Sequence, residues 1–257
     1  MFHTWEGIVL KSFPYSETHK IVTIFTTEAG KLAAMARGAS KPSSKLAAMT
    51  QPFVKGQFLL RTGRGMATLH QAEMIDSQRH IRSDLTAMAY ASYLVELIDK
   101  LTEEYDERTK GVYTLLNDAL HALNEGESPG AITLFVEWQM LPVAGIQPQI
   151  HCCASCGSTE GAFSFSFQQI GFLCEQCVSI DPHAYPLHPG LLRLIRTMSL
   201  VPIHEIGTLH LKQETIQLLQ RIVRTIYDEQ VGVWIKSRKF LEQLDTLPPL
   251  SGQSPHK

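Results

Sequence analysis

The 257-residue sequence predicts an α+β fold with more than one domain, and three observations support this prediction. The first eighty residues alternate apolar and polar positions with the two-residue period of β-strands. After about residue 81 the apolar positions recur with the period of helices, and two cysteine pairs interrupt this helical part. We therefore predict a strand-rich domain over residues 1–80 and a helical domain over residues 81–245. A polar, proline-rich tail over residues 246–257 is expected to be disordered.

Five short strands are predicted in the first domain, because runs rich in β-branched and aromatic residues are separated by turn-forming residues. We expect them at residues 5–13, 20–27, 31–37, 53–61 and 66–75. Five strands in eighty residues favour a small closed barrel of the OB type, which presents one strand face and its loops to oligonucleotides. The stretch 38–45 contains too many turn formers for a regular element, so we predict a mobile loop there.

Helices are predicted wherever apolar residues recur at spacings of three and four. Tyr90, Leu94, Leu97 and Leu101 form one such stripe, and a second stripe ends at Gly126, a typical helix stop. Further helices are expected near residues 131–141, 191–195, 216–226 and 235–244. The chain contains no apolar run of the about 20 residues that a transmembrane helix requires, and no secretory signal at its start. We therefore expect a cytoplasmic protein.

The segment at about residues 150–180 carries a predicted zinc ribbon with four cysteine ligands. These ligands are the pairs Cys153-x-x-Cys156 and Cys174-x-x-Cys177, with seventeen residues between them. Two residues between thiolates allow one turn to aim both sulfurs at one ion, and the intervening stretch is long enough for a hairpin that brings in the second pair. Four thiolates leave zinc no vacant position, so we predict one structural zinc ion rather than a catalytic one.

Alternatives to this ribbon fit the spacing less well. Cys152 could replace Cys153 as a ligand, but its four-residue separation from Cys156 suits a metal-binding turn poorly. A redox Cys-x-x-Cys, or a set of unrelated buried cysteines, does not account for two pairs at ribbon spacing. We expect the metal to replace the hydrophobic core that this hairpin lacks. An odd number of cysteines crowded into residues 152–177 also agrees with a reducing compartment.

The net charge of −2 conceals an uneven distribution along the chain. Residues 1–80 carry ten Lys/Arg against five Asp/Glu, a balance of +5, whereas residues 81–257 carry thirteen against twenty, a balance of −7. No acid occurs between Glu28 and Glu73, while this stretch contains seven cations: Lys31, Arg37, Lys41, Lys45, Lys55, Arg61 and Arg64. A cationic barrel predicts binding to a polyanion, and nucleic acid fits best. The alternative is an ordinary solvated face.

Aromatic rings near these cations could stack on bases. We expect Phe53 and Phe58 to be buried in the barrel and Tyr15, in a loop, to be exposed. No motif proposes a reaction, because phosphate-binding Gly-rich loops, the Gly-x-Ser-x-Gly elbow and His-Glu-x-x-His are absent from the sequence. We therefore predict that the protein is not an enzyme.

The sequence resembles the RecO family of bacterial DNA repair proteins over essentially its whole length. The resemblance is carried by the opening stretch GIVLKSFPYSETHKIVTIFTTEAGKLAAMARGASKPSSK, by the order of strand-rich and helical parts, and by the CASCG and CEQC pairs. It implies an OB domain, a helical domain with a zinc ribbon, and a recombination mediator that binds single- and double-stranded DNA and anneals complementary strands. With RecR, and in many bacteria RecF, such a mediator promotes RecA loading onto DNA coated by single-strand-binding protein. The family's basic loop matches Arg37, Lys41 and Lys45, which become the first choices for DNA contact.

The resemblance further implies that the helical domain binds the acidic, Phe-ended C-terminal tail of single-strand-binding protein, and that the protein is nucleoid-associated. Arg193, Arg196, Arg221 and Arg224 lie on predicted helices and could receive this tail, or could be ordinary exposed helix charges. Three other functions stay open. They are an adaptor that mainly binds partner proteins, a zinc-ribbon nucleic-acid-binding protein of another pathway, and a zinc hydrolase acting on nucleic acid.

Overall fold

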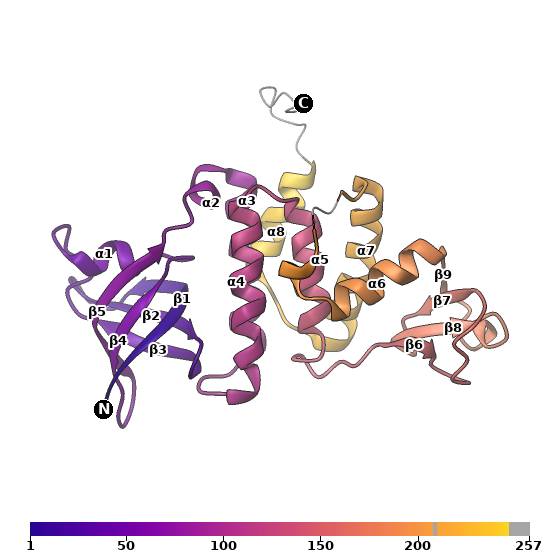
Figure 1. Cartoon of the computed structure of the whole chain (residues 1–257), viewed down its shortest axis with the longest axis horizontal. Coiled ribbons are helices and arrows are strands. Elements are labelled where there is room, and N and C mark those ends of the chain that lie inside the picture. Colours follow the sequence, from indigo (N-terminus) through magenta and orange to yellow (C-terminus); the bar gives the residue numbers. More distant parts are fainter. Residues whose placement is uncertain (208–209, 247–257) are drawn as a thin grey trace.

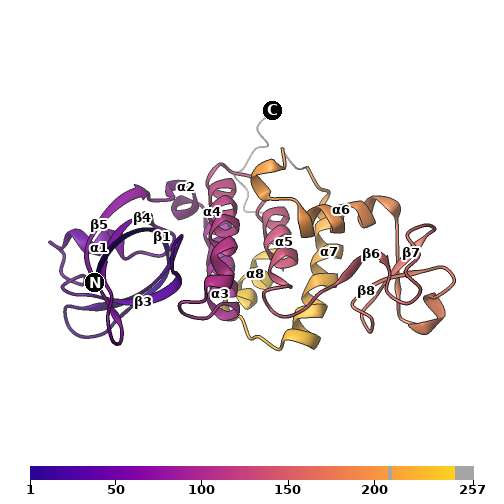
Figure 2. The same ribbon diagram turned by 60° about the horizontal axis from the view of Figure 1, so that its bottom comes forward.

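The structure, a computed structural model, describes residues 1–207 and 210–246. It has three parts in a row: a β-barrel at one end, a group of helices in the middle and a small β-sheet at the other end (Figure 1). The view from a second direction keeps this order (Figure 2). None of the helices in these residues has the length and hydropathy needed to cross a bilayer. The predicted tail over residues 246–257 lies outside the described residues, except for Thr246.

The N-terminal domain is the predicted five-stranded barrel. Its strands are β1 (Phe2–Pro14), β2 (Lys20–Thr26), β3 (Gly30–Ala36), β4 (Lys55–Arg61) and β5 (Ala67–Asp76). They close in the order β1-β2-β3-β5-β4, with β3 and β5 parallel and the other neighbouring pairs antiparallel. Because side chains alternate across each strand, Ile24, Phe58 and Leu60 point inward, where they are fully buried. Closure leaves the sheet without free edges.

The predicted mobile loop is more regular than expected. It leads into a short helix that the sequence analysis missed, α1 (Lys45–Met49), whose N-cap Ser44 accepts a hydrogen bond from the backbone N–H of Leu46. The preceding turns are tied to the loop between β1 and β2, because the backbone N–H of Ser40 donates to the carbonyl of Thr18. The turn formers therefore build a series of turns that connects β3 to α1.

Helices form the middle of the molecule. They are α2 (Arg79–Ser83), α3 (Leu85–Leu101), α4 (Lys110–Asn124), α5 (Pro129–Met140), α6 (Pro189–Leu200), α7 (Gln213–Ile226) and α8 (Lys236–Thr246). Single turns are η1 (Glu107–Thr109), η2 (Val178–Ile180), η3 (Ile203–Glu205) and the π-helical η4 (Tyr227–Val231). Helix α5 packs against α3, α4, α6 and α7, so nearly all its residues are buried. The predicted apolar stripes lie in these helices, and Gly126 follows α4 with a φ of +85°, as a helix stop should.

A four-stranded sheet is inserted between α5 and α6. Its strands are β6 (Gln149–Cys153), β7 (Phe163–Ser166), β8 (Gly171–Cys174) and β9 (Tyr185–Leu187), in the order β6-β8-β7-β9. Phe165 and Phe172 are fully buried in this sheet, and the ring of Trp138 on α5 lies edge-on to Phe165 with the centroids 6.2 Å apart. The expectation that a metal replaces a missing core is therefore wrong, because the ribbon shares an aromatic core with α5.

Candidate nucleic-acid interface and metal centre

Five of the seven cations that are predicted to contact DNA are exposed on the barrel. Arg37 follows β3, Lys41 lies in the next turn and Lys45 begins α1. Arg61 ends β4, and Arg64 lies in the turn between β4 and β5. Within the described residues none of the five side chains forms an ion pair or a hydrogen bond. Their charges are therefore free to meet an anion.

The order of the strands brings these cations to one side of the barrel. Strand β5 runs between β3 and β4. Ala36, at the end of β3, is opposite Leu69, and Leu69 is opposite Leu60, near the end of β4. Arg37 follows Ala36 and Arg61 follows Leu60, so the two arginines flank the same segment of β5. Helix α1 and the loop before it lie on the side of the barrel away from the helices (Figure 1).

Lys31 does not belong to this surface. Its ammonium is buried against the end of α3, where it donates to the backbone carbonyls of Asp99 (2.6 Å) and Thr102 and lies 3.6 Å from the Asp99 carboxylate. Burial lowers the pKa of Lys31, and the Asp99 charge partly opposes this effect. The ammonium joins the barrel to the helical domain, so we remove Lys31 from the predicted DNA-contacting residues.

Lys55 is also engaged within the chain. It donates to Oδ1 of Asn117 on α4 at 2.9 Å and pairs with the Glu6 carboxylate at 3.1 Å. Glu6 in turn accepts a hydrogen bond of 2.8 Å from the hydroxyl of Tyr113 on α4. Burial raises the pKa of Glu6, but the hydrogen bonds from Tyr113 and Lys55 outweigh burial and lower it. Lys55 therefore holds the barrel against α4, and we remove it from the predicted DNA surface as well.

The aromatic residues named from the sequence divide as expected. Phe53 and Phe58 are buried, whereas Tyr15 is 59% exposed, so all three predictions are confirmed. The loop that carries Tyr15 touches the basic loop, because Nδ1 of His19 accepts a hydrogen bond from the backbone N–H of Gly38 at 3.0 Å. Tyr15 thus lies on the cationic side of the barrel.

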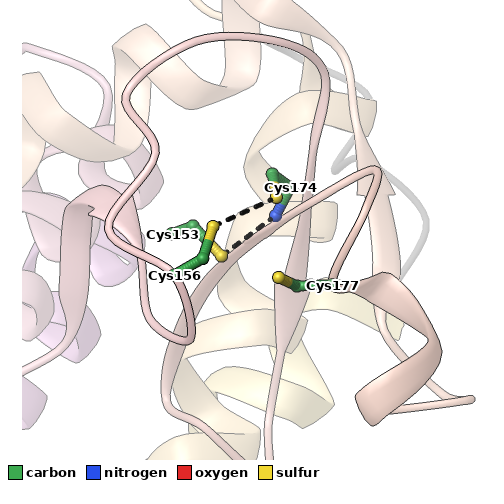
Figure 3. Close-up of side chains that lie close together, drawn as sticks. All are labelled: Cys153, Cys156, Cys174 and Cys177. Carbon is green, nitrogen blue, oxygen red and sulfur yellow. Dashed lines mark hydrogen bonds between the residues drawn. The ribbon is translucent and has the colours of Figure 1, made fainter.

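The four predicted cysteine ligands converge on one point (Figure 3). Their sulfur atoms all lie within 4.8 Å of one another, and the sulfurs of Cys156 and Cys174 are 3.7 Å apart. Thiolates about 2.3 Å from a tetrahedral zinc ion lie roughly 3.8 Å from one another, so the spacing fits. Figure 3 shows Cys153 and Cys156 facing Cys174 and Cys177 from across the ribbon.

The thiols of this cluster differ in how readily they ionise. Burial raises the pKa of Cys153, but hydrogen bonds from the backbone N–H groups of Cys156, Cys174 and Ser155 outweigh it and lower the pKa to about 6. A lowered pKa favours the thiolate that metal binding requires. At Cys177 the hydrogen bond with Ser155 lowers the pKa, but hydrogen bonds with the other three thiols and burial outweigh it and raise the pKa to about 12. Cys152 lies outside the group, in agreement with its assignment as a non-ligand. With four thiolates as the donor set, the residues present fit a structural metal ion.

The four arginines predicted to bind a partner tail do not form one group. Arg196 donates from Nε to the carbonyl of Ile150 at 2.7 Å and from Nη2 to the carbonyl of His151 at 3.1 Å. Its guanidinium also lies over the ring of Phe172, 5.6 Å from the centroid. Arg196 therefore ties α6 to the ribbon, whereas Arg193 on the same helix is exposed.

Arg221 and Arg224 on α7 do lie together, at a cavity of about 430 Å³ that Gln220 and Arg238 also line. Nε2 of Gln220 and both Nε and Nη2 of Arg224 are buried there without hydrogen-bond partners among the described residues. The buried carboxylate of Glu137 is 3.8 Å from Nε of Arg224, which is too far for a hydrogen bond. Arg238 is already paired with two acids. The unpartnered donors suit an incoming carboxylate. Gln220 and Arg238 could not be predicted from the sequence, because no local pattern marks them.

Comparisons with known proteins agree with this architecture. The family pattern described as Recombination protein O N terminal matches residues 1–78, and the one described as Recombination protein O C terminal matches residues 82–239. The DNA repair protein RecO of Halalkalibacterium halodurans is 42% identical over 247 residues, which cover 96% of this chain and 97% of that protein. The RecO proteins of Bacillus pumilus (43% over 247 residues, 96% of each chain) and Bacillus subtilis (41% over 249 residues, 97% of each chain) are similarly close. The chain therefore belongs to the RecO family of DNA repair and recombination proteins.

Proposed function

We propose that the protein binds single- and double-stranded DNA on the exposed cationic side of its barrel and anneals complementary strands. The observation that carries this proposal is a set of five exposed cations that have no partner in the described part of the chain: Arg37, Lys41, Lys45, Arg61 and Arg64. Such charges attract the phosphates of any sequence, so binding should depend strongly on salt and weakly on base sequence.

Annealing requires little beyond this surface. Two strands repel each other through their phosphates, and a cationic surface that neutralises part of this charge allows them to approach. The same surface raises the local concentration of strands. Because phosphate contacts do not read bases, the choice of partner is left to base pairing. No bond is made or broken by the protein in this mechanism.

In repair, we propose that this protein acts with RecR and, where it takes part, RecF to promote RecA loading onto DNA coated by single-strand-binding protein. The ion held by Cys153, Cys156, Cys174 and Cys177 is proposed to be zinc. It would supply no chemistry, because four thiolates leave no position for water or substrate. Its role would be to hold the ribbon in shape at the end of the molecule away from the barrel (Figure 1).

An annealing assay tests the DNA proposal directly. The triple substitution Arg37→Ala, Lys41→Ala and Lys45→Ala should slow the pairing of two complementary oligonucleotides, one carrying a fluorophore and the other a quencher. The matched control removes three exposed cations of the helical domain, Arg193, Lys212 and Arg221, and should anneal at the wild-type rate. If both triple variants anneal like wild type, the barrel contacts DNA only incidentally. That result would favour the adaptor function.

For the helical domain, we propose that the α7 cavity receives the acidic C-terminal tail of single-strand-binding protein. Support comes from the unpartnered donors of Gln220 and Arg224 and from the exposed Arg221 beside them. A carboxylate of the tail would pair with the exposed guanidinium of Arg221 and would offer an acceptor to Gln220 and Arg224, whose buried donors form no hydrogen bond within the described residues.

Binding of a fluorescent acidic peptide ending in Phe tests this site. Arg221→Glu reverses a charge at the cavity and should weaken binding about tenfold or more, which corresponds to about 1.4 kcal/mol. Arg193→Glu makes the same charge change on α6 and should leave binding within about twofold. Equal losses in both variants would mean that general charge attraction, and not the cavity, holds the peptide.

A further inference from the structure

An aromatic pair that the sequence analysis did not identify stands on the outside of the barrel. The ring of Phe2 lies 5.0 Å from the ring of His70, measured between centroids, with 68° between the ring planes. Phe2 is 58% exposed, and His70 is exposed as well. A single exposed apolar side chain is ordinary, but here two exposed rings are in contact and form a larger ring surface that is open to solvent.

The strand register explains how these two residues meet. Phe2 on β1 is opposite Arg61 on β4, so their side chains share one face of the sheet. On β5, the pairing with β4 skips His70, because Leu69 and Gln71 are the paired residues on either side of it. Such a bulge re-aims the extra side chain. His70 thereby meets Phe2 across the intervening strand β4.

The charge around this pair is positive. Residues 1–5 and 59–72 contain no Asp or Glu, whereas Arg61 is directly opposite Phe2 and Arg64 lies in the turn that follows β4. Arg37 follows Ala36, which is opposite Leu69, the residue before His70. The aromatic pair therefore lies within the cationic surface described above. In both views the N-terminal end of β1 is on the side of the barrel away from the helices (Figures 1 and 2).

We propose that the ring of Phe2 stacks on a base of single-stranded DNA and so acts as a stacking platform. His70 would support the ring through their edge contact, and Arg61 would bind the adjacent phosphate. This inference rests on the proposed DNA binding and adds to it a means of preferring single strands. A base in a duplex is already stacked between its neighbours, whereas every base of a single strand has a free face to offer. The cations attract both kinds of DNA, and the platform distinguishes between them.

Substitution of Phe2 tests the platform. Stacking of one base on an aromatic ring contributes enough that Phe2→Ala should weaken binding of a short single strand by about 5- to 150-fold. Duplex binding should change by less than about twofold. Because no charge is removed, the salt dependence of binding should keep the wild-type slope, whereas Arg61→Ala should reduce that slope by about 0.7. The fluorescence of a 2-aminopurine base in the strand should be quenched on binding to wild type and not on binding to Phe2→Ala.

Matched variants separate stacking from other contacts. Phe2→Trp should retain single-strand affinity, and Phe2→Leu, which keeps an apolar side chain without a π face, should lose it. Met66→Ala removes a comparably exposed apolar side chain from the nearby turn and should have no effect. Affinity retained by Phe2→Leu would overturn stacking in favour of plain apolar contact. A wild-type dimer that Phe2→Ala dissociates in sedimentation would also overturn it, because the patch would then bind a second copy.

DNA binding by wild type and by Phe2→Ala, measured side by side, separates the stacking platform from the proposed DNA binding. If wild type binds DNA and Phe2→Ala binds single strands equally well, the platform is refuted while the cationic surface stands. If wild type binds no DNA at moderate salt, both are refuted. No purification tag should be fused before Phe2, because it could cover the ring.

Discussion

Removal of three cations from the basic loop should flatten the salt dependence of single-strand binding. Each phosphate contact contributes about −0.7 to the slope of log affinity against log salt concentration on single strands. Five barrel cations are exposed and have no partner within residues 1–207 and 210–246, so wild type should have a slope of about −3.5. The variant Arg37→Ala, Lys41→Ala, Lys45→Ala keeps two of them and should have a slope of about −1.4.

These slopes translate into a large difference in affinity loss. Between about 50 and 200 mM salt, wild type should lose roughly 130-fold in affinity and the triple variant only about sevenfold. Fluorescence anisotropy of a labelled oligothymidine, titrated at four or more salt concentrations, measures both slopes. Thymidine avoids base pairing within the probe, so the change reports on the protein alone.

Two results would refute this reasoning. A triple variant with the wild-type slope would show that the basic loop does not contact phosphate. A wild-type slope near −5 would require contacts from all seven predicted cations. That value contradicts the burial of Lys31 and the engagement of Lys55. The control variant lacking Arg193, Lys212 and Arg221 should keep the wild-type slope, because these charges lie on the helical domain.

Three further predictions concern the metal, the domain interface and pH. Cys174→Ser should lose bound zinc and lower the melting temperature, whereas Cys152→Ser should keep about one zinc per chain by metal analysis. Lys31→Met leaves the buried carbonyl of Thr102 and the part-buried carbonyl of Asp99 without their donor and should cost about 1–3 kcal/mol in urea unfolding; a cost below about 0.5 kcal/mol would contradict the interface role. The hydrogen bond to the Asp118 carboxylate raises the pKa of His204, so its stabilising effect should be complete below pH 6.5 and vanish as pH rises through the raised pKa. Melting temperatures of wild type and His204→Gln should therefore differ more at acidic than at alkaline pH, and a constant difference would contradict the pairing.

Some of the candidate site could be predicted because its signals are local. The alternation in β2 and β3, together with the turn residues between them, is enough to indicate strands before any tertiary contact is known. The signal for the cysteine cluster is equally local, since each Cys-x-x-Cys pair sits on one turn and its spacing alone limits the geometry. Helix α1 shows the limit of this approach, because its cap at Ser44 is a weak signal among several serines.

The fate of individual charged side chains depends on residues far away in the sequence. Lys31 binds carbonyls 68 and 71 positions further on, and Lys55 binds a side chain 62 positions away. Arg196 donates a hydrogen bond to the carbonyl of Ile150 in the ribbon, which lies 46 positions earlier in the sequence. Charge patterning along the chain contains no information about such partners, so it could not separate binding cations from structural ones.

The sequence by itself determined the five barrel strands, the helical stripes, the two Cys-x-x-Cys pairs that cluster and the cationic bias of the first domain, because each depends on periodicity, spacing or composition. Only the tertiary structure decided which cations stay free, that the ribbon shares its aromatic core with α5, and that Phe2 and His70 meet beside Arg61. The physical reason is that burial and pairing are properties of packed neighbours. Those neighbours come together only when the barrel closes and docks against the helices.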